Sequence, residues 1–333
     1  NTADRLVQAE TLYALLDPDA FPAEVIDDAW TNVVLFSEHT WGAAESKSKP
    51  ESEMTKSLWE VKKGFTLDAQ QTAETSINEV LPSIEPSQPV KSIQIINTLS
   101  WARTDLVTLP ASWNLTGYRI VEEDGKEIAS QVLNSGELVF VATDIPAFGS
   151  KKFHLKKGKP RPTGSVQVER DKIENDRIRI QMDEQTGQIE QIFDKEMGIE
   201  FVNEDDTLGF NTYWYSGLIR ENASKNHSPV FNISENGPLL SSILIKSQGE
   251  GAHTIEQEIR LISGMNRIEI TNTVDKIKVI ENENVRFSFP FEIENGQLSM
   301  DIPWGVMKPG VNQLQGANYN FFCAQRFLDI SND

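Results

Sequence analysis

The sequence contains a single cysteine, Cys323, so it can form neither an internal disulfide nor a metal site made only of cysteines. Its apolar runs are no longer than a β-strand, whereas a membrane-spanning helix needs roughly 20 such residues. Basic residues are also scarce: 31 Lys and Arg stand against 50 Asp and Glu, which gives a net charge of −19. We therefore expect no disulfide scaffold, no membrane span and no nucleic-acid partner, because nucleic-acid binding requires a basic face.

Several sequence motifs of common enzyme classes are missing as well. There is no glycine-rich phosphate loop, no zinc-protease helix motif and no serine nucleophile elbow. Of the four histidines, His154 lies in a predicted strand, and His227 and His253 lie in stretches that predict exposed loops. An alternative in which two of these three act with a Glu as the acid–base set of a sugar epimerase on a large β-sandwich has no supporting local spacing.

The first 80 residues have the apolar spacing of helices. Three apolar stripes predict a helix that stops at residues 17–18, a second from about residue 22 to residue 42, and a third from about residue 51 towards residue 78. Helices with such stripes can bury them against one another, so we expect a three-helix bundle at residues 1–81. The expected buried side of the third helix consists of Met54, Leu58, Val61, Phe65, Ala69, Ala73 and Ile77.

Beyond a proline-rich linker at residues 82–91, the apolar spacing changes to the period of two that is typical of strands. Six short strands are expected at residues 92–97, 105–109, 118–122, 128–133, 138–143 and 151–155. Their length and the Asp124-Gly125 and Ser135-Gly136 turn signals predict a small β-sandwich at residues 92–157.

A second linker is expected at residues 158–164, and the strands after it alternate more regularly. They are expected at residues 178–182, 189–193, 243–246, 255–262, 267–274 and 285–292. This pattern predicts one large antiparallel sandwich at residues 165–333, truncated at its C-terminus. The helical pattern starts at Asn1, so we expect the N-terminus to be truncated too. The predicted fold class is multidomain α+β.

His39 differs from the other histidines because it follows an apolar helix, in the segment Glu38-His39-Thr40-Trp41-Gly42. The end of a helix beside a conformationally free glycine is a good place to expose an imidazole to a cleft. The neighbouring tryptophan offers an apolar platform on which a sugar ring can stack. The alternative is a histidine that only interacts favourably with the dipole at the helix C-terminus.

The segment from Ala29-Trp30 through Glu38–Gly42 resembles the helix and loop of the middle domain of glycoside hydrolase family 38 α-mannosidases. Other stretches resemble the same family in the same order, and together they cover most of the chain. They are Ile96-Asn97-Thr98-Leu99-Ser100-Trp101-Ala102-Arg103, Asp144-Ile145-Pro146-Ala147-Phe148-Gly149, Ile173-Glu174-Asn175-Asp176, Thr186-Gly187-Gln188-Ile189 and Phe193-Asp194-Lys195.

The resemblance implies an α/β catalytic barrel, then a three-helix domain, then β-sandwiches ending in a supersandwich like that of galactose mutarotase. The barrel is absent from this chain, and with it both catalytic carboxylates. We therefore expect no catalytic residue within the chain. The family's zinc ligand in the middle domain maps onto His39, and the other ligands would come from the missing N-terminal catalytic domain. Neutral imidazole is a suitable ligand for Zn²⁺.

The sequence departs from the family pattern directly after the ligand histidine. The α-mannosidases usually have Asp there, whereas this chain has Thr40, and Trp41 follows sooner. Thr40 can still hydrogen-bond a sugar hydroxyl, and Glu38 is the candidate for the missing carboxylate. Tyr213 and Tyr215 lie where the family's sandwich can reach towards the active site; the alternative for both is an aromatic strand packed in the core.

We therefore expect part of a zinc-dependent retaining glycosidase that acts on a carbohydrate substrate such as an α-mannoside and is inactive alone. Its substrate-binding residues would be Glu38, Thr40, Trp41, Tyr213 and Tyr215, and its metal ligand His39. The alternative is a non-catalytic carbohydrate-binding β-sandwich protein. A cytoplasmic location and a secreted or periplasmic one are both compatible with the sequence.

Overall fold

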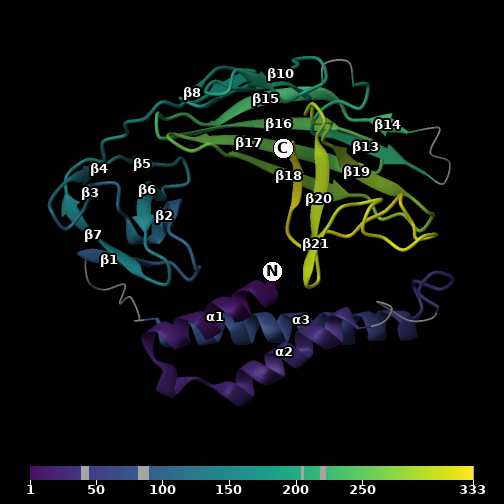
Figure 1. The fold of residues 1–333 in the computed structure, drawn as a ribbon, viewed down its shortest axis with the longest axis horizontal. Helices are drawn as coiled ribbons and strands as arrows, with labels where there is room; N and C mark the ends of the chain where they lie inside the picture. The colour runs from purple at the N-terminus through teal and green to yellow at the C-terminus, as the bar shows by residue number, and fades with distance from the viewer. Residues whose placement is uncertain (39–44, 82–89, 204–205, 218–222, 333) are drawn as a thin grey trace. The chain divides into compact units, whose positions relative to one another are not determined.

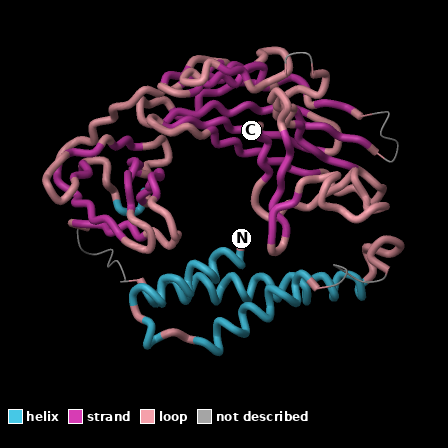
Figure 2. Tube along the Cα trace, viewed as in Figure 1, coloured by secondary structure: helices cyan, strands magenta, loops and turns pink. Residues whose placement is uncertain are grey.

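A computed structural model describes residues 1–38, 45–81, 90–203, 206–217 and 223–332. The chain forms two compact units, Asn1–Thr163 and Gly164–Asp333. The boundary between them falls within residues 158–164, where the sequence predicts a linker. Figure 2 shows the change from helix to strand along the chain. No helix among the described residues is both long and apolar enough to cross a membrane.

The first unit begins with three helices that lie alongside one another (Figure 1): α1 (Thr2–Leu16), α2 (Ala23–Ser37) and α3 (Glu53–Val80). A short 3₁₀ turn, η1 (Pro18–Ala20), connects the first two, because Pro18 cannot continue α1. Ser52 caps α3, its hydroxyl accepting a hydrogen bond from the amide of Thr55 at 3.2 Å. One buried cluster joins the three helices and consists of Leu6, Ile26, Ala29, Ala69 and Ala73, and Ala9, Leu12 and Tyr13 of α1 are buried too.

The predicted buried side of α3 is correct only in its C-terminal half. Ala69 and Ala73 are fully buried, but Met54 and Val61 are 64% and 54% exposed. The reason is length. A helix rises about 1.5 Å per residue, so the 28 residues of α3 span about 42 Å while the 15 residues of each partner span about 22 Å. Part of α3 therefore extends beyond the helices described beside it.

The same unit continues with two antiparallel sheets, of strand order β1-β7-β3-β4 and β2-β6-β5. The two sheets share a core in which Phe140 of one meets Phe153 of the other edge to face, with ring centroids 5.0 Å apart. The strands are β1 (Ser92–Ile96), β2 (Arg103–Leu109), β3 (Tyr118–Val121), β4 (Glu127–Ile128), β5 (Ser130–Val132), β6 (Leu138–Ile145) and β7 (Ser150–Lys157), with the 3₁₀ turn η2 (Ala111–Trp113) after β2.

The single strand predicted at residues 128–133 is wrong in one respect, because the chain changes sheets within it. β4 pairs with β3, whereas β5 pairs with β6, and Ala129 lies between them. The change lets one short segment contribute to both layers of the small sandwich, which apolar spacing alone does not reveal.

The second unit contains four antiparallel sheets, of order β12-β11-β10-β9-β8, β15-β16-β17-β18, β14-β13-β19 and β21-β20-β22. The strands of the first sheet are β8 (Gln167–Val168), β9 (Lys172–Glu174), β10 (Ile178–Met182), β11 (Ile189–Asp194) and β12 (Ile199–Glu200). Those of the second are β15 (His227–Glu235), β16 (Leu240–Gln248), β17 (Ala252–Ile262) and β18 (Ile268–Lys276). The others are β13 (Thr212–Ser216), β14 (Ser224–Lys225), β19 (Asn284–Ser288), β20 (Gln297–Ile302), β21 (Gly305–Met307) and β22 (Leu328–Ser331).

The main core of this unit lies between the first two sheets. Ile180 and Ile189 come from the first sheet, and Ile243, Ile259 and Leu261 from the second, all nearly or fully buried. In the second sheet, Ile243 and Ile259 are paired across β16 and β17, which lie side by side in Figure 1. Period-two alternation presents these residues on one face, so two such faces pack as a sandwich.

The multidomain α+β fold class predicted from the sequence is thus confirmed. Two smaller predictions are wrong: His227 begins β15 and His253 lies in β17, although both stretches predict loops. His154 lies in β7, as its surroundings predict. β15 escapes sequence reasoning because it contains Pro229 and carries mostly exposed or half-buried side chains.

Candidate functional site

Lys62 anchors the C-terminal end of α2. Its ammonium nitrogen donates hydrogen bonds to the carbonyl oxygens of Leu35 at 2.8 Å and Glu38 at 3.0 Å, and forms an ion pair with the carboxylate of Glu38 at 3.0 Å. The last carbonyls of a helix lack partners within the helix and favour a cation. Lys62 supplies both the hydrogen-bond donor and the positive charge, so it ties the segment just before His39 to α3.

His39, Thr40 and Trp41 lie outside the described residues, so their predicted roles stay predictions. Glu38 is described, and its side chain is 56% exposed even though it pairs with Lys62. Within the described ranges, no three or more His, Cys, Asp or Glu side chains are grouped so that they could hold a metal ion.

Tyr213 and Tyr215 lie in β13 and pack against Ile255 of β17 in a small cluster. Tyr213 is completely buried, and its hydroxyl donates to the carbonyl oxygen of Glu250 at 2.8 Å. Tyr215 is 9% exposed, and its ring passes so close to Gly251 that a β-carbon there would lie 2.3 Å from a ring carbon. Both rings pack in this buried cluster of the second unit, and their contact with a sugar stays a prediction.

The two tyrosines have a strongly acidic neighbourhood. Burial raises the pKa of Tyr213 to about 12, with a further contribution from the negative charge of Glu283. The pKa of Tyr215 is also raised, by burial and by a hydrogen bond with Glu283. Lys276 forms an ion pair with Glu283 at 2.7 Å and lies 5.9 Å from the centre of the Tyr215 ring. Both phenols therefore stay protonated at neutral pH, as donors of hydrogen bonds rather than as bases.

Two asparagines from the stretches that resemble family 38 hold buried turns. Asn97 is buried, and its amide nitrogen donates to the carbonyl oxygens of Trp101, Ile145 and Pro146. Asn175 is buried as well. Its amide nitrogen donates to the carbonyl oxygens of two residues of the other sheet's turn, and its oxygen accepts from two amides of its own turn. These stretches therefore build the sandwiches, and their resemblance reflects the fold.

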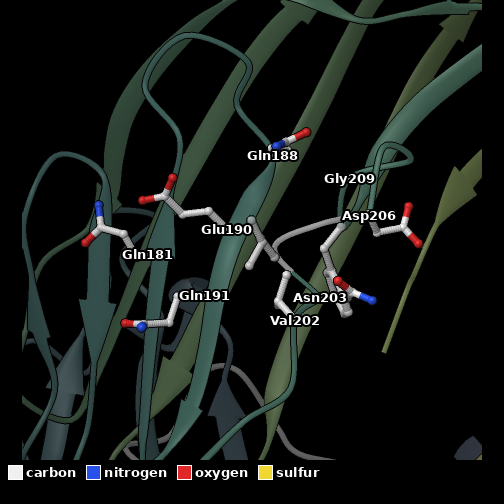
Figure 3. Close-up of a pocket in the computed structure, with 10 residues that line it drawn as sticks. Gln181, Gln188, Glu190, Gln191, Val202, Asn203, Asp206 and Gly209 are labelled. Atoms are coloured by element: carbon white, nitrogen blue, oxygen red, sulfur yellow. The ribbon is translucent and has the colours of Figure 1, made fainter. Parts of the chain in front are cut away.

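Sequence reasoning did not anticipate a polar pocket of about 530 Å³ in the second unit. Figure 3 shows Gln181, Glu190 and Gln191 on one side and Asn203 and Asp206 on the other. A β-bulge between β10 and β11 creates the first side. Gln181 pairs with Gln191 and the next pair joins Met182 to Ile189, so Glu190 is the extra residue of the bulge. The adjacent outward polar residues Glu190 and Gln191 were the only sequence signal for it.

The chain resembles known proteins in both sequence and fold. Residues 173–333 match the family model described as the Glycosyl hydrolases family 38 C-terminal domain. A solved structure of a protein in glycosyl hydrolase family 38 from Enterococcus faecalis has a TM-score of 0.65 and 15% identity, covering 92% of this chain and 46% of that one. An α-mannosidase from Enterococcus faecalis V583 has a TM-score of 0.62 and 14% identity, covering 93% and 45%. No curated protein sequence matches the chain.

The fold thus defines a multidomain α+β protein in which a three-helix bundle precedes two antiparallel β-domains. The match of residues 173–333 to the model of the glycosyl hydrolase family 38 C-terminal domain confirms the resemblance seen in the sequence. At 15% and 14% identity, the likeness to the solved structures establishes the fold alone. The chain spans less than half the length of either structure.

Proposed function

We propose that this chain is part of a zinc-dependent retaining glycosidase that acts on α-mannosides, with His39 as one ligand of the zinc ion. The observation that supports this most is the match of residues 173–333 to the family 38 C-terminal domain. The likeness in fold extends over 92% of the chain to one family member and over 93% to a protein described as an α-mannosidase.

The proposed contribution of the chain to the metal is a single imidazole. Neutral histidine binds Zn²⁺ through a ring nitrogen, and His39 follows a helix end that Lys62 fixes to α3. Bound zinc would supply a charged template for substrate hydroxyls. The remaining ligands, and the two carboxylates of a retaining mechanism, would come from a catalytic domain outside this chain.

Exposed apolar side chains of α2 and α3 support a second domain packed against these helices. Val34 is 64% exposed, and Leu35, Met54, Leu58 and Val61 are exposed too. Apolar side chains gathered on an exposed surface are typical of surfaces that another protein surface covers. We propose that the catalytic domain packs here, which would bring its ligands to His39.

The first experiment measures hydrolysis of an aryl α-mannoside by the purified 333-residue chain. We expect no turnover, because the proposed nucleophile and acid–base carboxylates lie outside it. Turnover above the rate in buffer would contradict the proposal that the catalytic groups belong to another domain.

The second experiment replaces His39 with alanine in the full-length enzyme and measures bound zinc together with hydrolysis. We expect zinc content and activity to fall together, and circular dichroism to show that the helices persist. His154→Ala is the matched control, since His154 is a half-buried strand residue of the small sandwich. Unchanged zinc stoichiometry in His39→Ala would rule out the ligand assignment.

A further inference from the structure

We propose that the pocket beside the bulge of β11 is a binding site for a neutral saccharide. Its described lining residues come from β10, β11, the turn between them, and residues 202–203 and 206–210, all in the second unit. Its volume of about 530 Å³ falls within the range of roughly 300–1,000 Å³ that is usual for small-molecule sites.

The floor of the pocket is rigid because it belongs to the core. Ile189, Val202 and Phe210 are each at most 5% exposed. An isolated bridge joins Ile189 to Phe210, with the amide of Ile189 donating to the carbonyl oxygen of Phe210 at 3.0 Å. The polar side chains therefore project from a fixed base, which reduces the entropy lost when a ligand is held.

Contacts with neighbouring side chains orient the polar walls. The guanidinium of Arg179 donates to the amide oxygen of Gln191 at 2.9 Å, which leaves the amide N–H groups as the donor end of that side chain. Gln181 donates to the carboxylate of Asp171 at 2.8 Å. The carboxylate of Asp206 accepts from the amide of Leu208 at 2.6 Å.

Gly209 makes the close approach of Gln188 possible. Its φ of +74° is a left-handed conformation that favours glycine, and a β-carbon there would lie 2.2 Å from the amide oxygen of Gln188. Both residues line the pocket. A glycine therefore occupies a position where a side chain would displace the amide of Gln188 from the pocket wall.

The chemistry of the wall selects the class of ligand. Carboxylates accept hydrogen bonds, amides both donate and accept, and a sugar hydroxyl can pair with either. Among the described residues, the lining contains Glu190 and Asp206 but neither Lys nor Arg, so an anionic ligand would be repelled. A bare cation would leave the amide donors without acceptors. A compact molecule with several hydroxyl groups and no charge satisfies the whole set.

The test is saturation-transfer difference NMR on the full 333-residue chain. The probes are methyl α-D-mannopyranoside, methyl α-D-galactopyranoside and methyl α-D-glucopyranoside; only the choice of the mannoside as first probe rests on the proposed function. We expect transfer to at least one of the three. Glu190→Ala should raise its Kd at least about tenfold, because a hydrogen bond to a charged group is lost, and Asn203→Ala on the opposite wall should weaken it less.

Glu196→Ala is the matched control, since Glu196 is an exposed carboxylate near the end of β11 that does not line the pocket. It should bind the saccharide as the unchanged chain does. Absence of transfer to all three probes, or equal affinity in Glu190→Ala and the unchanged chain, would overturn the proposal. So would calorimetric binding of Ca²⁺ that displaces the saccharide and is lost in Glu190→Ala.

The proposals for the pocket and for the zinc site can be tested independently. Saccharide binding that survives in His39→Ala supports the pocket whatever becomes of the metal.

Discussion

The helical bundle and the large antiparallel domain bury their interiors in different ways. One buried cluster of the bundle contains three alanines and two larger aliphatic residues, and Ala9, Leu12 and Tyr13 of α1 are buried as well. The large domain buries thirteen apolar residues in one cluster, most of them Ile, Leu, Val or Met. Two sheets hold the large aliphatic side chains of the sandwich between them, whereas small alanines fill much of the cluster between the helices. A truncation in the core should therefore cost more in the sandwich than in the bundle.

The largest expected effect is a matched truncation in the two cores. Ile259→Ala should destabilise the large domain by about 4 kcal/mol, because a cavity lined by fixed sheets cannot collapse. Ile26→Ala should cost the bundle about 2 kcal/mol, because helices beside small alanines can close the gap. Both isoleucines are at most 1% exposed, which makes the pair comparable. Hydrogen exchange measured by mass spectrometry would report the loss of protection in each region. Equal losses would remove the contrast between the two interiors.

The next largest effects are expected from polar side chains that stabilise a buried turn and a helix end. Asn175→Ala should cost the large domain about 3 kcal/mol, since two buried carbonyls and two amides lose their partner. Ser52→Ala removes the cap of α3 and should cost about 1 kcal/mol. Urea unfolding followed by circular dichroism and by tryptophan fluorescence would measure both. Asn175→Asp is the sharper variant, because it replaces the buried donor with a charge that faces two carbonyl oxygens.

Low pH should lower the stability of the large domain. A hydrogen bond from Lys195 lowers the pKa of Glu174 below its ordinary 4.5, and a hydrogen bond from Ser165 lowers that of Asp176 below 3.8. A lowered carboxyl pKa contributes stability that is fully present above the unfolded value and is lost as the pH falls through the folded value. The melting temperature of this domain should therefore begin to fall below about pH 4.5. Glu174→Gln should flatten that fall; an unchanged acid profile in this variant would contradict the assignment.

The smallest effect is expected at the end of α2. Lys62→Met should destabilise the bundle by about 1 kcal/mol, because two carbonyls at the helix end lose a cation. Glu38→Gln should cost no more than about 0.5 kcal/mol, since an exposed ion pair contributes little. Thermal unfolding of the two variants side by side would compare them. A larger loss in Glu38→Gln than in Lys62→Met would mean that the ion pair, and not the cap, holds this segment.

The sequence allowed much of the local structure to be predicted. Asp17-Pro18 ends α1 as expected, and strand predictions around Ile180, Ile192 and Ile259 lie within observed strands. Such elements follow from local rules, because proline stops a helix and period-two alternation favours a strand. The missed strand β15 and the change of sheets at Ala129 depend on pairing with distant residues, which local spacing does not encode.

The candidate sites divide in the same way. Acidic composition, the isolated His39 and the ordered stretches that resemble family 38 could all be read from the sequence, because each is a property of neighbouring residues. Only the folded chain decided that Tyr213 is buried, that Lys62 from α3 caps α2, and that the bulge at Glu190 opens a pocket against Asn203 and Asp206. Burial, capping across helices and concavity arise from contacts between distant segments, and these contacts exist only once the sheets and helices have packed.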